Sequence, residues 1–203
     1  MLAGEGLTLW RGTTCLFEAL SFALPAGRCL LIEGPNGAGK TSLLRILAGL
    51  TQPDDGNLTW HGADCTAEVR AGRLRLTFAG HGLALKSELT ARANLEFFAH
   101  LAGTSRRVAE VLARTGVDGC ADLEVRQLSA GQKRRVALGR VLLARAELWL
   151  LDEPQTNLDA AGRQMMEAEV RGHLAGGGTA IIAAHQSLDL PPDQVVRLRL
   201  GDA

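Results

Sequence analysis

A glycine-rich segment near the N-terminus contains the residue types that bind phosphate groups. It fits the pattern G-x-x-x-x-G-K-[ST] and lies between an apolar run at residues 29–32 and a helical pattern at residues 41–50. Glycines let backbone N–H groups point at phosphate oxygens, and a helix N-terminus adds positive partial charge. The segment therefore predicts a phosphate loop, because a glycine-rich turn without a ligand would not need these flanking elements. Its residues are Gly34, Pro35, Asn36, Gly37, Ala38, Gly39, Lys40 and Thr41.

Two side chains of the phosphate loop predict phosphoryl transfer. Lys40 is expected to reach the β- and γ-phosphates of a nucleotide, and the Thr41 hydroxyl is expected to bind Mg²⁺. Ser42 continues the same predicted nucleotide-binding segment.

An acidic pair follows a second apolar run, at residues 148–151. A buried strand there would deliver Asp152 to the end of the sheet at which α/β folds bind ligands. We expect Asp152 to complete the Mg²⁺ site and Glu153 to orient or deprotonate the attacking water. Acidic residues often end strands, so the pair alone indicates little; together with the phosphate loop it predicts hydrolysis.

The segment Leu-Ser-Ala-Gly-Gln at residues 128–132 begins a helical pattern. Ser129 followed by Gln132 three residues later is typical of a capping box, which is a purely structural feature. His185 follows an apolar run at residues 180–184, and a lone histidine there is usually structural. Ser129 lies 23 residues before Asp152, so a helix cap is an incomplete interpretation of this segment, and the position of His185, 32 residues after Glu153, favours a functional role.

The pattern of apolar residues predicts an α/β fold with a mainly parallel sheet. Residues 29–32, 148–151 and 180–184 are continuous apolar runs, typical of strands buried on both faces. Residues 7–10 and 20–24 predict antiparallel strands, and further strands are expected at residues 58–60, 74–78 and 195–200. Helices are expected at residues 91–101, 106–115, 130–144 and 160–174. Ser105 is the expected N-cap of the second of these, and Gly116 its C-terminal stop.

Composition excludes several classes of protein. The chain has 203 residues, of which 46% are hydrophobic, with 22 basic and 22 acidic side chains, as in an ordinary globular protein. The formal net charge of zero predicts no binding to nucleic acid and no polybasic membrane anchor. Apolar runs are too short for a spanning helix, and no secretory signal is evident. Four widely spaced cysteines favour reduced thiols in the cytoplasm.

The phosphate loop, the LSAGQ segment (residues 128–132) and the Leu-Leu-Asp-Glu-Pro run together resemble the nucleotide-binding subunits of ATP-binding cassette (ABC) transporters. The resemblance extends over essentially the whole chain. It implies one nucleotide-binding domain, residues 1–203, with an N-terminal antiparallel subdomain and a helical subdomain inserted at roughly residues 86–145. It also implies ATP with Mg²⁺ and a head-to-tail homodimer, in which Ser129, Gly131 and Gln132 of one copy close over the nucleotide of the other. Ala130 stands where the family usually has glycine.

The resemblance implies roles for three further positions. Residues 156–159 match the D-loop, which places Asp159 among the nucleotide-contacting residues. His185 matches the switch histidine that contacts the γ-phosphate and acts with Lys40 and Glu153 in catalysis. Trp10 is either the aromatic side chain that stacks on adenine or an ordinary core residue of an early strand.

One family feature is missing. The glutamine loop should follow residues 74–78, but residues 79–86 contain no glutamine. Either His81 substitutes for the glutamine, or Gly82 occupies its position and water completes the metal shell.

The same region resembles one branch of the family. Gly80 and His81, followed by Leu-Lys-Ser-Glu-Leu-Thr-Ala at residues 85–91, resemble the CcmA branch, the haem-exporter ATPases of cytochrome c maturation. This implies a peripheral subunit on the cytoplasmic face of the inner membrane, bound to a CcmB-like permease and near a CcmC-like haem-handling protein. ATP would drive either haem export or release of a haem-loaded chaperone. Two alternatives are the ATPase of another ABC transporter and a non-transport ABC ATPase. A P-loop kinase would not explain LSAGQ.

Overall fold

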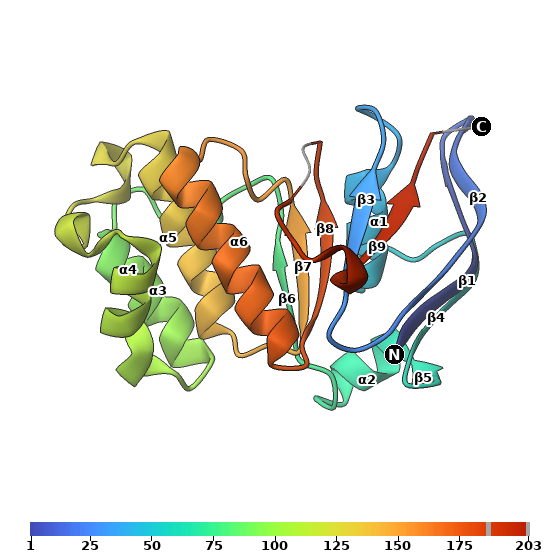
Figure 1. Cartoon of the computed structure of the whole chain (residues 1–203), viewed down its shortest axis with the longest axis horizontal. Coiled ribbons are helices and arrows are strands. Elements are labelled where there is room, and N and C mark those ends of the chain that lie inside the picture. Colours follow the sequence, from blue (N-terminus) through green and yellow to red (C-terminus); the bar gives the residue numbers. More distant parts are fainter. Residues whose placement is uncertain (186–187, 202–203) are drawn as a thin grey trace. The chain divides into compact units, whose positions relative to one another are not determined.

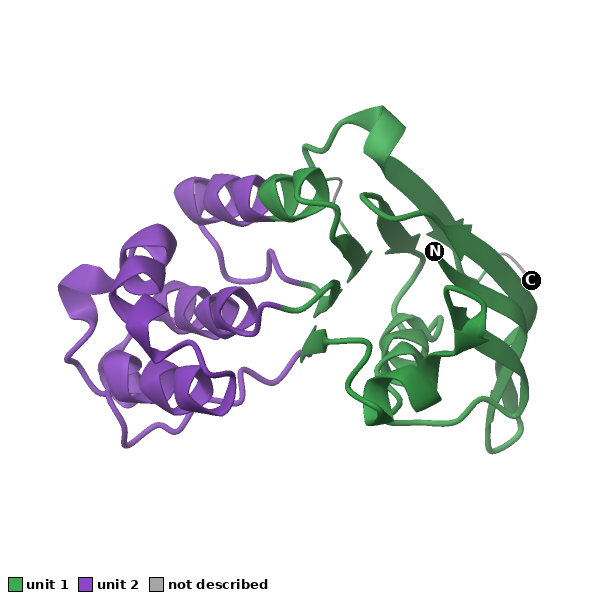
Figure 2. Ribbon diagram, turned by 90° about the horizontal axis from the view of Figure 1, so that it is seen from below, with its two compact units in different colours: residues 1–78, 146–153, 170–203 green, residues 79–145, 154–169 purple. Residues whose placement is uncertain are grey.

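The computed structural model describes residues 1–185 and 188–201. The chain forms two compact units, coloured separately in Figure 2. Unit 1 contains Met1–Phe78, Ala146–Glu153 and Val170–Ala203, and unit 2 contains Ala79–Arg145 and Pro154–Glu169.

Unit 1 contains nearly all of the strands, which form two sheets. The antiparallel sheet has the order β2-β1-β4-β5, and the second sheet has the order β6-β7-β8-β3-β9. In the second sheet β3 pairs in parallel with β8 and β9, and β7 pairs in parallel with β8 (Figure 1). The strands are β1 Leu2–Arg11, β2 Thr14–Leu24, β3 Cys29–Glu33, β4 Asp55–Trp60, β5 Ala63–Asp64, β6 Leu76–Ala79, β7 Leu148–Asp152, β8 Thr179–Ala183 and β9 Val195–Arg199. The predicted α/β class is confirmed.

The continuous apolar runs form the centre of the parallel sheet, as their composition predicted. Every residue of β7 and β8 is buried, and β3 is buried except at Glu33. Helix α1, Lys40–Leu47, contacts β7 and β8 and buries four aliphatic side chains. The core of unit 1 therefore lies directly beneath the ends of β3 and β7, and it fixes the loops that leave those two strands.

Unit 2 is mainly helical. Helices α3 (Ala91–Leu101) and α4 (Val108–Thr115) both pack against α5 (Ala130–Leu143), and Gly139 of α5 permits the close approach. A Cβ atom at this position would lie 3.1 Å from Leu95 of α3 and 3.1 Å from Val111 of α4. Two further helices are α2, Cys65–Arg70 of unit 1, and α6, Ala160–Ala175, which begins in unit 2 and ends in unit 1.

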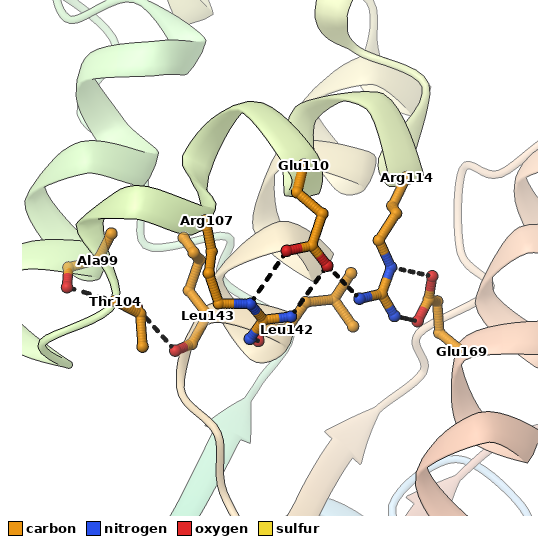
Figure 3. Close-up of polar contacts among 8 residues, drawn as sticks. All are labelled: Ala99, Thr104, Arg107, Glu110, Arg114, Leu142, Leu143 and Glu169. Atoms are coloured by element: carbon orange, nitrogen blue, oxygen red, sulfur yellow. Dashed lines mark hydrogen bonds and ion pairs between the residues drawn. The ribbon is translucent and has the colours of Figure 1, made fainter.

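The expected N-cap at Ser105 is wrong. Ser105–Arg107 form a turn of 3₁₀-helix without a side-chain cap, and α4 begins at Val108. The buried hydroxyl of Thr104 instead donates to the Leu143 carbonyl oxygen at 3.0 Å, which ties this turn to the end of α5 (Figure 3). The predicted C-terminal stop is confirmed, since Gly116 ends α4 in the left-handed conformation at φ 65°.

An ion-pair network joins α4 to the first part of α6. Glu110 accepts hydrogen bonds from Arg107 and Arg114, and Arg114 also pairs with Glu169 (Figure 3). These two guanidinium groups, Arg107 first, lower the pKa of Glu110 to about 2. Three of the four side chains are on or next to α4, and the Arg114–Glu169 pair joins that helix to residues 160–169.

Within residues 1–185 and 188–201 no helix has the length and apolar character to cross a membrane. The four cysteines carry free thiols, and three of them are buried. Burial raises the pKa of the Cys29 thiol to about 12, so this thiol is protonated at neutral pH.

Candidate active site

The phosphate loop joins the end of β3 to the start of α1, and Gly34 is required for its path. Gly34 has φ +143°, and a Cβ atom there would lie 2.4 Å from the backbone oxygen of Leu200. Gly39 has φ +93° and packs against Leu16 and Phe17 of β2. Only glycine fits such positions without strain. The loop backbone is thus fixed by β2 and by the chain after β9.

Lys40 is buried inside this loop. Its side chain is 6% exposed, and Nζ donates to the carbonyl oxygens of Gly34 at 2.7 Å and Pro35 at 2.9 Å. The ammonium group is therefore held at the centre of the loop that surrounds it. A buried ammonium ion in this position supplies a point charge for a phosphate group.

Thr41 and Asp152 meet although they are far apart in the sequence. The Thr41 hydroxyl donates to Asp152 Oδ2 at 2.9 Å, and Asp152 is 3% exposed at the carboxyl end of β7. The parallel neighbours β3, β8 and β7 all end at this edge of the sheet, so the chain segments that follow them converge. A hydroxyl oxygen beside a carboxylate is a donor set of the kind Mg²⁺ prefers, and it fits the predicted metal site.

Glu153 and His185 also lie together. His185 Nε2 lies 2.9 Å from Glu153 Oε1, and both side chains are partly exposed. Glu153 has φ +48°, a left-handed conformation that is unfavourable for a glutamate, and its N–H donates to the Ala183 carbonyl oxygen at 2.8 Å. The strained backbone turns the carboxylate away from the path of β7. The Glu153 carboxylate, with His185 as its neighbour, has the chemistry of a proton acceptor.

Trp10 is not a core residue. It lies near the end of β1, and its side chain is 46% exposed, so the core alternative is wrong. Its backbone N–H donates to Asp54 Oδ2 at 2.6 Å, and across the antiparallel ladder it pairs with Cys15 of β2. An exposed indole on the strand next to β2 remains available to stack on a base.

The second group of predicted residues belongs to unit 2. Ser129 and Gln132 form the predicted capping box: Gln132 N–H donates to Ser129 Oγ at 3.2 Å, and Ser129 N–H donates to Gln132 Oε1 at 2.9 Å. Ser129 is nevertheless exposed at the start of α5. A Cβ atom on Gly131 would lie 3.0 Å from the Asn157 carbonyl oxygen. The LSAGQ segment therefore packs closely against residues 156–159.

Asp159 fixes the end of the segment at residues 156–159. It accepts from Gly162 N–H at 2.8 Å and from Arg135 Nη2 at 2.6 Å. The hydrogen bond from the Gly162 amide, and next the one from Arg135, lower the pKa of Asp159. Asp159 thus caps the start of α6 and joins it to α5. Sequence reasoning missed Arg135 because nothing in a run of basic residues indicates which one has an acidic partner.

The segment in place of the glutamine loop contains an exposed His81. Two arginines of α5 that the sequence did not single out donate to backbone carbonyl oxygens of this segment: Arg134 to Gly80 and Arg140 to Leu83. The sequence held an indirect signal for Arg140 alone, which lies among apolar residues of α5, where a long charged side chain needs a partner. Arg134 stands in the basic run at residues 133–135, which gives no such signal.

Unit 1 thus combines a glycine loop, a lysine, a hydroxyl–carboxylate pair and a glutamate–histidine pair, and the arrangement can support in-line hydrolysis of a phosphoanhydride. Unit 2 presents Ser129, Gly131 and Gln132 at the N-terminus of α5.

Comparisons with known proteins agree with this geometry. The family described as ABC transporter matches residues 17–156. Among curated relatives, the cytochrome c biogenesis ATP-binding export protein CcmA of Salmonella typhi is 44% identical over 200 residues, covering 98% of this chain and 97% of the relative. The CcmA protein of Methylococcus capsulatus is 43% identical over 195 residues, covering 95% of this chain and 94% of that protein.

Solved structures show the same fold. An ABC transporter ATP-binding protein from Pyrococcus furiosus has a TM-score of 0.84 at 23% identity, with 98% of this chain and 96% of that chain covered. A dimeric ATP-binding cassette in a post-hydrolysis state with ADP and Pi has a TM-score of 0.79 at 20% identity, with 98% and 96% covered.

Proposed function

Because the chain belongs to the ABC transporter family of ATP-binding proteins, we propose that it is the ATP-hydrolysing subunit of a membrane complex for cytochrome c maturation. Hydrolysis would drive haem export or the release of a haem-loaded chaperone. The observation that carries this proposal is the 44% identity with a CcmA protein over 98% of the chain. The meeting of Thr41 with Asp152, and of Glu153 with His185, supports the chemistry.

The mechanism follows from the side chains of unit 1. The phosphate loop binds the triphosphate through backbone N–H groups, and Lys40 adds charge at the β- and γ-phosphates. Thr41 and Asp152 would hold Mg²⁺, which neutralises phosphate charge when bound. Glu153 accepts a proton from the attacking water, and His185 holds that carboxylate and stabilises the γ-phosphoryl group. Most of the rate enhancement comes from positioning and charge stabilisation.

The remaining predicted residues act across a homodimer in this proposal. Ser129, Gly131 and Gln132 of one copy would close over the nucleotide held by the phosphate loop of the other, with Asp159 at the same interface and Trp10 stacked on adenine. The exposure of Ser129 and Trp10 supports this arrangement, since both are accessible to a ligand. The dimeric cassette that shares this fold was solved with ADP and Pi.

We also propose that residues 1–203 act as one nucleotide-binding domain with a helical subdomain inserted at roughly residues 86–145, of which roughly residues 86–122 contact the membrane partner. That partner would be a CcmB-like permease, with a CcmC-like haem-handling protein nearby, at the cytoplasmic face of the inner membrane. Either His81 would substitute for the glutamine as the polar contact, or Gly82 would occupy its position and water would complete the metal shell.

Co-purification tests the assignment of partners. The Glu153→Gln chain would be isolated from mild-detergent extracts of its native cells with ATP and Mg²⁺ present, because a variant that binds but does not hydrolyse ATP keeps the complex closed. We expect a small polytopic permease and a haem-handling membrane protein. Recovery of a different permease would leave only the ATPase chemistry, and recovery of ribosomes or DNA would favour a non-transport ATPase.

A further inference from the structure

The loop after β6, residues 80–90, has almost no regular secondary structure, yet side chains of two helices engage its backbone. Asn94 of α3, which is 2% exposed, accepts from Lys86 N–H at 2.8 Å and donates to the carbonyl oxygens of Lys86 and Thr90, each at 3.0 Å. The first part of the loop is engaged by Arg134 and Arg140 of α5 instead. Both arginines line a small cavity beneath residues 79–83.

Arg134 contacts two separate segments. Its side chain is 5% exposed, Nε donates to the Pro154 carbonyl oxygen at 3.2 Å, and Nη1 donates to the Gly80 carbonyl oxygen at 3.5 Å. Pro154 directly follows Glu153 in the chain, and Gly80 begins the loop that lacks the glutamine. One guanidinium group therefore connects both segments to α5, two residues beyond Gln132.

Arg140 contacts the loop and the ring of Phe98 on α3. Its Nη1 donates to the Leu83 carbonyl oxygen at 2.6 Å, and its guanidinium carbon lies 4.0 Å from the centre of the Phe98 ring. Burial lowers the pKa of Arg140. Arg140 thus offers a natural comparison, since it engages the same loop without reaching Pro154.

We propose that Arg134 is a positioning residue for hydrolysis, which fixes the segment after Glu153 and the start of the 80–90 loop to the helix that carries LSAGQ. The planar fork of arginine can donate to two carbonyl groups at once, which the ammonium group of lysine does less well. Any shift of α5 is then transmitted to both segments together. This inference rests on the proposed ATPase function, and its effect is on the placement of Glu153 and not on nucleotide binding.

The test uses the full chain and four variants: Arg134→Met, Arg134→Lys, Arg140→Met and Lys133→Met. Steady-state hydrolysis gives kcat and KM for Mg-ATP, and hydrogen exchange reports the backbone of residues 79–86 and 154–159. Lys133→Met is the matched control, because it removes the adjacent charge from α5 while Arg134 keeps its hydrogen bonds to Gly80 and Pro154. Its kcat should equal that of the wild type.

We expect Arg134→Met to lower kcat about tenfold with KM changed less than about twofold, since misplacement of a catalytic group acts on the transition state. Exchange should rise in both segments, whereas in Arg140→Met it should rise only in residues 79–86. Arg134→Lys should restore part of kcat, and it keeps the test decisive if Arg134→Met does not fold.

Three results would overturn the proposal: an unchanged kcat in Arg134→Met, a raised KM with unchanged kcat, or faster exchange spread evenly over the chain. A kcat of Arg134→Lys equal to that of the wild type would also overturn it, because the two contacts with Gly80 and Pro154 would then not need the planar guanidinium group. A wild-type chain without any Mg-ATP hydrolysis would refute the proposed function itself, so the two failures are distinguishable.

Discussion

Replacement of Thr41 by valine removes the hydroxyl group that bonds Asp152 while keeping the shape of the side chain. In the lost hydrogen bond, Thr41 Oγ1 lies 2.9 Å from Asp152 Oδ2. The acceptor carboxylate is buried, since Asp152 is 3% exposed. A hydrogen bond to a charged group contributes about 1.5–3 kcal/mol to the free energy of unfolding. Thr41 itself is exposed, so we take the lower end, about 1.5 kcal/mol. For a chain of this size that loss lowers Tm by about 4 °C.

The assay is thermal unfolding of the wild type, Thr41→Val and Thr41→Ser, followed with and without Mg-ATP. Thr41→Ser keeps the hydroxyl and should unfold close to the wild-type Tm. Added Mg-ATP should raise the Tm of the valine variant less, because binding stabilises the folded state by RT ln(1 + [L]/Kd) and the metal site has lost a ligand. Equal Tm values for the valine and serine variants, with equal gains from Mg-ATP, would refute the role assigned to this pair.

Three further predictions follow from the site and the core. Glu153→Gln should keep ATP binding and abolish turnover, as measured by nucleotide binding and phosphate release; normal turnover would remove Glu153 from its role. Trp10→Ala should leave Tm nearly unchanged, because the indole is 46% exposed, and weaken ATP binding about fivefold in a titration. The His173 ring stacks on Trp149 with the ring centres 4.0 Å apart, and burial lowers its pKa below the ordinary 6.5. As pH falls, His173 therefore binds a proton in the unfolded chain before it does so in the folded one. Stability should therefore be full above pH 6.5 and decline as pH falls towards the lowered pKa, and denaturant titrations should find this decline absent in His173→Phe.

The buried strands and the packed helices could be predicted from the sequence because apolar residues decide them. β7 and β8 are buried along their whole length, as continuous apolar runs predict. The region at residues 63–70 could not be predicted in the same way. It forms β5 and α2, of which only Cys65 is buried, so it has no apolar periodicity to detect. α1 ends at Leu47, earlier than expected, and the turn after it includes Gly49 at φ +69°.

The site was predictable where one motif implies one geometry. The phosphate loop and the strand ending in Asp152 imply that Thr41 and Asp152 approach each other, and the structure brings them to 2.9 Å. The left-handed backbone at Glu153 was not predictable, because no glycine or asparagine marks it. The bridge made by Arg134 depends on tertiary contacts with two carbonyl groups, and a sequence does not specify which carbonyl a buried arginine will reach.

The central claim is that hydrolysis at Glu153 is needed for cytochrome c maturation. The most direct test measures covalently bound haem in the c-type cytochromes of cells that lack this gene and carry either the wild-type chain or Glu153→Gln. We predict haem-stained cytochromes with the wild type and none with the variant at equal protein level. Normal haem attachment with Glu153→Gln, or in cells with no copy at all, would contradict the account.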